Sequence, residues 1–365
     1  MLDYGSMEGR KTTVRIARAI KKPDRILADD AYWNVPFLER YLMRCDEVGV
    51  HEPKTAYEMS APVVDLADTR ISILGRPGAY KSAVERRSYR VQARIVRAQA
   101  AKGVGECGEA EDLYAAAFRL AEEEIGTSVR TRLHTRYAWL LFMQSNPEAV
   151  EHAQKAIELK SDKVTLAAAL LARAASAHKF ENKTRLDDLA SALALTKTER
   201  TSKRGRRVFY AALHALAKIL SDSNPLPDTQ AKAYVLLGEV KSYLAGRPKS
   251  VAKMQVYWQM GRIAWNLGYD KHGPRLMRKA RQGFRELGEP FELAMISLDL
   301  AGLYLESGEL EEYAELVADT YEFLESFGDA KLLKALSSWS RGLRTTKAEL
   351  AKTRQVIEEL KDGSS

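Results

Sequence analysis

Apolar residues recur along this chain at intervals of three and four, and they almost nowhere alternate over the length of a strand. This spacing places apolar side chains along one face of an α-helix. Residues 80–102 show the pattern before it stops at Gly103, with apolar side chains at Tyr80, Val84, Tyr89, Val91, Ile95 and Ala98. Short polar breaks separate about sixteen such segments, which predicts an all-α protein. The one strand-like stretch is Ile71–Leu74.

A longer repeat joins these helices into pairs. The same pattern, three residues on one helix face at spacings of four and then three, occurs four times. It begins at Ala110, Ala149, Gly273 and Tyr313. The first two blocks start 39 residues apart and the last two start 40 residues apart. Small side chains on such a face let two helices approach closely. A period of about 40 residues with two helices in it indicates an α-solenoid, so we predict stacked antiparallel helix pairs.

With this period, the chain resembles the tetratricopeptide-repeat superfamily in its longer-period bacterial regulatory form. The residues that carry the resemblance lie in two consecutive units at Gly261, Ala264, Gly268, Leu300, Ala301, Tyr304 and Gly308. Gly273 and Tyr313 depart from the usual alanine of the repeat. The resemblance covers roughly residues 31–343 and implies a right-handed superhelix. It also implies a regulator or adaptor in signalling, transcription control or defence.

Three regions follow from this boundary. Residues 1–30 form a basic, partly flexible N-terminal segment, with seven basic residues and one acidic residue between Arg10 and Arg25. Residues 31–343 form the repeat domain. Residues 344–365 form a charged C-terminal helix and tail, which would cap the array because an end repeat must shield its face from water.

Composition and charge narrow the class of protein. The chain is 45% hydrophobic and 29% charged, which is typical of a globular protein. No stretch is long and apolar enough for a transmembrane helix, and two cysteines without a CxxC motif exclude a disulfide framework, so we expect a cytoplasmic protein. The net charge is +8, yet Gly288 to Ala330 holds twelve acidic residues and no lysine or arginine. Either neighbouring repeats stack with opposite charge or the molecule has separate binding faces.

Catalytic, nucleotide and metal motifs are weak. The segment Gly75–Ser82 resembles a phosphate-binding loop, but Tyr80 stands where the second glycine is needed. The six histidines lack metal-ligand spacing, and Cys45 and Cys107 show no activating context. We therefore predict no catalytic residue, no metal and no cofactor.

Four arginines, Arg86, Arg90, Arg94 and Arg97, follow one another at steps of four, four and three on the helix of residues 80–102. This spacing puts their guanidinium groups on one face. They are candidates for binding an acidic partner, since the guanidinium fork suits carboxylates and phosphates. The alternative is that they pair with Glu85, Glu106 or Glu109 nearby.

The principal binding surface is predicted on the helix of residues 251–267. If Gly261 occupies the close-packing position of its repeat, one other face carries Gln255, Trp258, Gln259, Arg262, Trp265 and Asn266. Two indoles flanking a guanidinium are typical of binding hot spots. The alternative is that both tryptophans belong to the repeat core and pack on the helix of residues 270–286.

Three functions compete. A non-catalytic scaffold that binds a protein or peptide partner on its concave face fits the repeat array and the lack of catalytic motifs. A basic nucleic-acid-binding regulator fits the positive charge, but no DNA-binding motif is present. An enzyme with an unfamiliar site comes last, and no membrane partner is expected.

Overall fold

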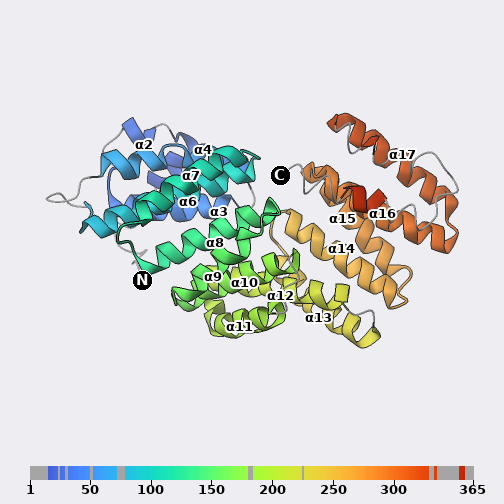
Figure 1. Ribbon diagram of the computed structural model, residues 1–365. Helices are drawn as coiled ribbons and strands as arrows, with labels where there is room; N and C mark the ends of the chain where they lie inside the picture. Colours follow the sequence, from blue (N-terminus) through green and yellow to red (C-terminus); the bar gives the residue numbers. More distant parts are fainter. Residues whose placement is uncertain are drawn as a thin grey trace. The chain divides into compact units, whose positions relative to one another are not determined.

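The computed structural model describes residues 15–23, 25–28, 32–49, 52–71, 79–179, 184–223, 226–328, 333–334 and 353–357. All regular structure within these ranges is helical, which confirms the all-α prediction (Figure 1). Residues 72–78, which include most of the strand-like stretch and the first half of the segment Gly75–Ser82, lie outside them. The chain forms two compact units, Met1–Asp188 and Leu189–Ser365. The boundaries predicted at residues 30 and 343 stay predictions.

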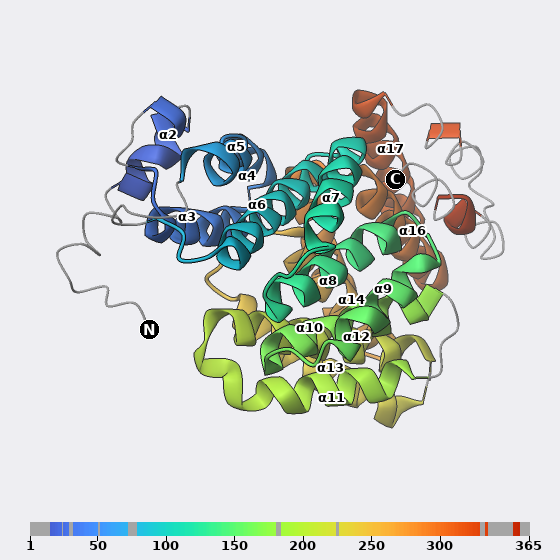
Figure 2. The same ribbon diagram turned by 60° about the vertical axis from the view of Figure 1, so that its left-hand side comes forward.

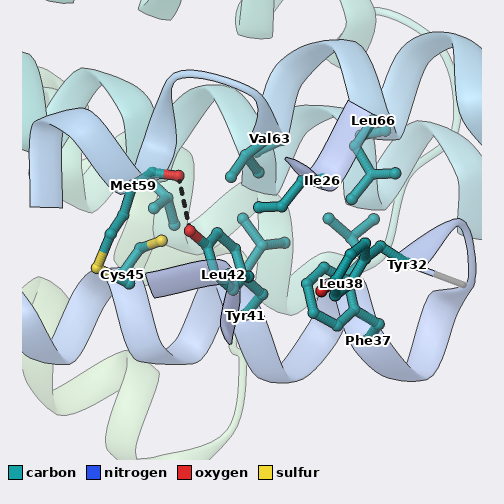
Figure 3. Packing of buried hydrophobic residues seen from close by; sticks show 14 of the residues in the cluster. Ile26, Tyr32, Phe37, Leu38, Tyr41, Leu42, Cys45, Met59, Val63 and Leu66 are labelled. Carbon is teal, nitrogen blue, oxygen red and sulfur yellow. Dashed lines mark hydrogen bonds between the residues drawn. The ribbon is translucent and has the colours of Figure 1, made fainter. Parts of the chain in front are cut away.

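The N-terminal unit begins with short helices around an aromatic core. After a helical stretch at residues 15–21 come α2 (Arg25–Ala28), α3 (Val35–Val48), α4 (Pro53–Ser60), α5 (Val63–Asp65) and the π-helical turn η2 (Leu66–Arg70). Phe37 and Tyr41 of α3 stack with ring centroids 5.3 Å apart, and the Tyr41 hydroxyl donates to the Met59 carbonyl at 3.1 Å (Figure 3). Cys45 is buried beside them, and burial raises the pKa of its thiol.

Longer helices complete this unit. They are α6 (Ala83–Gly103), α7 (Cys107–Ala121), α8 (Thr127–Met143), α9 (Glu148–Glu158) and α10 (Lys163–Lys179). Figure 2 shows α8, α9 and α10 side by side, and each of the three contacts the other two. The faces predicted from the repeat are fully buried, at Ala110, Tyr114, Ala117, Ala149, Ala153 and Ala156.

The C-terminal unit stacks three helix pairs. After α11 (Arg185–Lys197), in which the boundary between the units falls, and the turn η3 (Thr198–Thr201), α12 (Lys203–Ser223) pairs with α13 (Pro227–Leu244). Next, α14 (Val251–Asn266) pairs with α15 (His272–Leu287), and α16 (Pro290–Ser307) pairs with α17 (Leu310–Phe327). Glycines end the last three helices in the left-handed conformation, at Gly288, Gly308 and Gly328. A helical turn at residues 353–357 also belongs to this unit.

Two glycines set the separation of α14 and α15. A Cβ atom on Gly261 would lie 2.9 Å from the Gly273 carbonyl oxygen, and a Cβ on Gly273 would lie 2.9 Å from the Gly261 carbonyl oxygen. Real Cβ atoms do not come so close to a backbone oxygen. The departure from alanine at Gly273 therefore has a steric reason, and Gly261 holds the close-packing position that the sequence predicts.

Opposite charges meet between consecutive repeats of this unit. Arg281 of α15 contacts the Asp319 carboxylate of α17 at 2.6 Å, and Arg285 contacts its other oxygen at 2.5 Å. Burial acts to raise the pKa of Asp319, but the hydrogen bonds from both arginines hold it below its usual value. The acidic stretch thus serves at least in part to stack one repeat on the next.

Candidate partner-binding face

Six of the predicted binding residues lie on α14, the first helix of the middle pair, with the first helices α12 and α16 of the neighbouring pairs on either side. Side chains of α14 contact α12 on one flank and α16 on the other. Gly261 packs closely on α15, and the side chains of α14 that make these polar contacts lie beside that interface. The six predicted residues of α14, together with the side chains of α12 and α16 that contact them, are called the α14 face below.

Both tryptophans of the α14 face combine a packed ring with a polar contact. Trp258 Nε1 donates to Asp299 Oδ2 at 2.8 Å, and its ring meets the Phe284 ring edge-on with centroids 6.1 Å apart. Trp265 Nε1 donates to Glu306 Oε2 at 3.2 Å. Both rings are partly buried against the core of this unit. The two alternatives of the sequence therefore both describe part of the geometry: the rings pack and the indole N–H groups bind carboxylates.

Arg262 lies between two acidic side chains. Its Nε is 3.5 Å from Asp299 Oδ2 and its Nη1 is 4.0 Å from Asp222 Oδ1. The Arg262 side chain is 42% exposed, whereas that of Asp299 is only 13% exposed. A guanidinium with this exposure remains accessible to a partner even though it contacts carboxylates of its own chain.

Asp299 joins three donors and was missed by the sequence reasoning. It accepts from Trp258 and contacts Arg262 through Oδ2, while Arg354 of the C-terminal turn contacts Oδ1. A signal was nevertheless present, because Trp258 and Asp299 are 41 residues apart and Trp265 and Glu306 are also 41 apart. That distance is one repeat, so equivalent positions on neighbouring first helices meet.

The amide side chains of the α14 face differ in their surroundings. Gln259 Oε1 lies 3.0 Å from His214 Nε2 of α12, at hydrogen-bonding distance. Burial disfavours the charged imidazolium and lowers the pKa of His214 to about 4, although the contact with Gln259 acts in the other direction. Gln255 is half-buried and Asn266 is exposed. The face thus offers a neutral histidine, amides and indoles around one accessible guanidinium.

The arginine stripe lies in the N-terminal unit, and three of its members converge on Asp68 of η2. Arg90 Nε contacts Asp68 Oδ1 at 2.8 Å, and Arg94 contacts both carboxylate oxygens, at 2.9 and 2.6 Å. Arg86 donates to the Asp68 carbonyl oxygen at 2.9 Å. Burial acts to raise the pKa of Asp68, but the hydrogen bonds from Arg94 and Arg90 hold it below its usual value.

The fourth member of the stripe, Arg97, pairs with one of the acids named from the sequence. Its Nε is 2.7 Å from Glu109 Oε1, and its guanidinium lies 3.8 Å from the centroid of the Tyr57 ring. The stripe therefore contributes ion pairs within the chain, as the alternative interpretation held, although the main acceptor is Asp68. Binding of an acidic partner by these arginines stays a prediction.

Two histidines that the sequence reasoning treated separately meet in the N-terminal unit. The Nδ1 atoms of His134 and His152 are 3.1 Å apart, so one imidazole donates to the other. Burial is the main cause that lowers both pKa values, that of His134 to about 4, and Phe118 and Tyr137 pack around the pair. Among the described residues, no cluster of three or more His, Cys, Asp or Glu side chains could hold a metal ion. No helix in the same ranges is long and apolar enough to cross a membrane.

No protein-family model matches the chain, and no curated protein matches it in sequence. Among solved structures, a Rap protein complexed with Competence and Sporulation Factor is similar over 88% of this chain and 89% of its own, with a TM-score of 0.58 and 15% identity. The chain shares the fold of this Rap protein. The predicted helical-repeat architecture is thereby confirmed, while the handedness of the superhelix stays a prediction.

Two other solved structures are similar at lower TM-scores. The Rap conjugation gene regulator of plasmid pLS20 in complex with the Phr* peptide covers 89% of this chain and 97% of its own, with a TM-score of 0.49 and 11% identity. BtubC from P. vanneervenii covers 80% and 90%, with a TM-score of 0.28 and 14% identity. Because both TM-scores are below 0.5, nothing about this chain is inferred from these two structures.

Proposed function

We propose that this chain is a non-catalytic regulator that binds a peptide or protein partner on the α14 face. The observation that carries the proposal is the exposed guanidinium of Arg262 between the partly buried rings of Trp258 and Trp265. Tryptophan and arginine are the residue types most enriched at binding hot spots. Polar groups lined up along a row of helices also suit an extended or helical polypeptide.

The shared fold supports the same proposal in a general way. The Rap protein of similar fold was solved in complex with Competence and Sporulation Factor. A fold by itself does not define a function, so the binding role is inferred from the α14 face of this chain. We infer a binding role there because the face has no nucleophile beside a base and offers donors, acceptors and rings instead.

Nucleic acid is the weaker candidate partner. The arginine stripe, which suggested phosphate binding, contacts Asp68 and Glu109 of the same chain. The α14 face carries Asp299 and Glu306, whose carboxylates repel phosphates. Binding of duplex DNA that falls steeply as salt is raised would favour this alternative over a polypeptide.

A peptide library displayed on phage and selected on the full chain tests the proposal. We expect Arg262→Ala to weaken the binding free energy of the selected peptides by about 1–3 kcal/mol, measured by titration calorimetry. The melting temperature of the variant should stay almost unchanged. Arg278→Ala is the matched control, because Arg278 is an exposed arginine on α15. Equal binding by both variants, or no enriched peptide at all, would overturn the proposal.

A further inference from the structure

The C-terminal turn of this chain contacts the α14 face through a single charged side chain. Arg354 Nη1 contacts Asp299 Oδ1, while Trp258 and Arg262 contact the other oxygen of the same carboxylate. Figure 1 shows the short dark-red turn near α16, the helix that carries Asp299. Asp299 is thus a carboxylate with one oxygen held by α14 and the other by a segment from the end of the chain.

Two of the five described residues of the turn, Thr353 and Ile357, are buried. Ile357 is fully buried in the same apolar cluster as Phe284 and Leu300, and Thr353 is 4% exposed. Arg354 is 29% exposed and lies at the edge of this contact. The buried side chains of Thr353 and Ile357 dock the described residues of this turn, and Arg354 adds the polar contact.

Resting on the proposed function, we propose that the turn is an internal ligand of the α14 face and that a partner replaces it. The partner then places a basic side chain on Asp299 Oδ1, where Arg354 lies, and an aliphatic side chain where Ile357 lies. The two positions are three residues apart, which puts them on one face of a helical turn. The partner is therefore a polypeptide with a basic residue followed three positions later by an aliphatic one.

The electrostatics favour a basic rather than an acidic side chain at this point. Asp299 is a carboxylate of low exposure, and such a group needs cationic or donor partners. When the turn leaves, Oδ1 loses the contact with Arg354, and a basic side chain of the partner restores it with a charge-assisted hydrogen bond. Arg262 remains bound to the other oxygen and does not compete for the same position.

A labelled peptide with the sequence of residues 350–361 tests this proposal on the full chain. The wild-type chain should bind the peptide weakly, because its own turn occupies the face, and Arg354→Ala should bind it about tenfold more tightly. Adding Asp299→Asn to Arg354→Ala should abolish that gain, and a peptide with alanine in place of its arginine should not bind. Circular dichroism establishes that each variant is folded, and Arg354→Lys should behave almost as the wild type.

Two outcomes separate this proposal from the proposed function. Equal binding of the labelled peptide by the wild type and by Arg354→Ala overturns the internal ligand, even if phage-selected peptides still require Arg262. Tighter binding by Arg354→Ala supports the internal ligand, even if the library yields no peptide. In the unaltered chain, a displacing peptide should also speed hydrogen exchange at Ile357, and unchanged exchange with a bound peptide would overturn the displacement.

Discussion

Trp258 and Asp299 lie 41 residues apart and join neighbouring repeats, with the indole Nε1 donating to the carboxylate at 2.8 Å. Trp265 and Glu306 repeat the contact about two helical turns further along, also 41 residues apart. The same carboxylate of Asp299 also contacts Arg262 and Arg354. Asp299 therefore links α14, α16 and the C-terminal turn through one carboxylate.

Asp299→Ala should destabilise the C-terminal unit. The change leaves the Trp258 N–H without its acceptor and Arg262 and Arg354 without a shared carboxylate. We expect the free energy of unfolding to fall by about 1–3 kcal/mol in urea denaturation. Asp270→Ala is the matched control, because Asp270 is exposed, and it should change stability by less than about 0.5 kcal/mol. Equal effects would show that Asp299 does not hold the repeats together.

Gly273→Ala restores the residue usual in the repeat, yet it should destabilise the chain. The added methyl would meet the Gly261 carbonyl oxygen and the backbone nitrogen of Trp265, at 2.9 and 3.0 Å. We expect a loss of about 1–3 kcal/mol, as for other overpacked positions. Gly238→Ala in α13 is the control, since nothing lies within 4 Å of its Cβ position, and it should stabilise by about 0.4–1 kcal/mol. A stabilising Gly273→Ala would contradict the close approach.

Arg94→Ala should destabilise the N-terminal unit rather than act on binding alone. Arg94 is 11% exposed and contacts both oxygens of Asp68. We expect a loss of about 1.5–3 kcal/mol, the range for hydrogen bonds to charged groups. Arg44→Ala removes an exposed pair with Glu47 and should cost at most about 1 kcal/mol. If Arg94→Ala left the free energy of unfolding unchanged, the arginine stripe would be a binding surface and not a set of stabilising ion pairs.

Acidification should remove the contribution of the Asp68 ion pairs to the free energy of unfolding. The pKa of this carboxyl is lower in the folded chain than its ordinary value of 3.8. Its stabilising effect is therefore complete above that value and is lost as the pH falls through the folded pKa. Urea denaturation at a series of acidic pH values should show that the free energy of unfolding declines less for Asp68→Asn than for the wild type. The same decline in both chains would exclude the ion pairs as its source.

Buried His214 should make the free energy of unfolding decrease already at a higher pH than Asp68 does. The pKa of His214 is lowered from 6.5 to about 4 in the folded chain, so the unfolded chain takes up the proton first. The stabilising effect is present above about 6.5 and is lost as the pH falls toward about 4. We expect His214→Gln to lose stability less steeply over this window than the wild type, measured by urea denaturation. A parallel pH profile would show that His214 is charged in the folded chain.

The sequence predicted the helices and their pairing because a period of about 40 residues repeats the same small buried faces. Ala110, Tyr114 and Ala117 are buried as that period requires. It did not predict Asp68, since Asp68 lies in a π-helical turn that belongs to no repeat. The contact of His134 with His152 joins two helices of one pair, which spacing along the chain does not reveal. Asp299 was within reach, because the period relates it to Trp258.

Of the predicted binding residues, the structure brings together those of α14 on one face and places the arginine stripe in the other unit. A pattern along one helix was sufficient to group Trp258, Arg262 and Trp265. It could not show that Arg354 meets the same face, since that contact links α16 to a turn 55 residues further along, which no repeat period relates to it.

The approach of Gly261 to Gly273 has a consequence for how related chains can vary. Each glycine leaves the space that the carbonyl of the other fills, so a side chain at either position forces the two helices apart. The positions are therefore coupled in evolution: a larger residue at one would need a compensating shift along α15, and single replacements should be removed by selection. In an alignment of close relatives, these two columns should vary together or not at all.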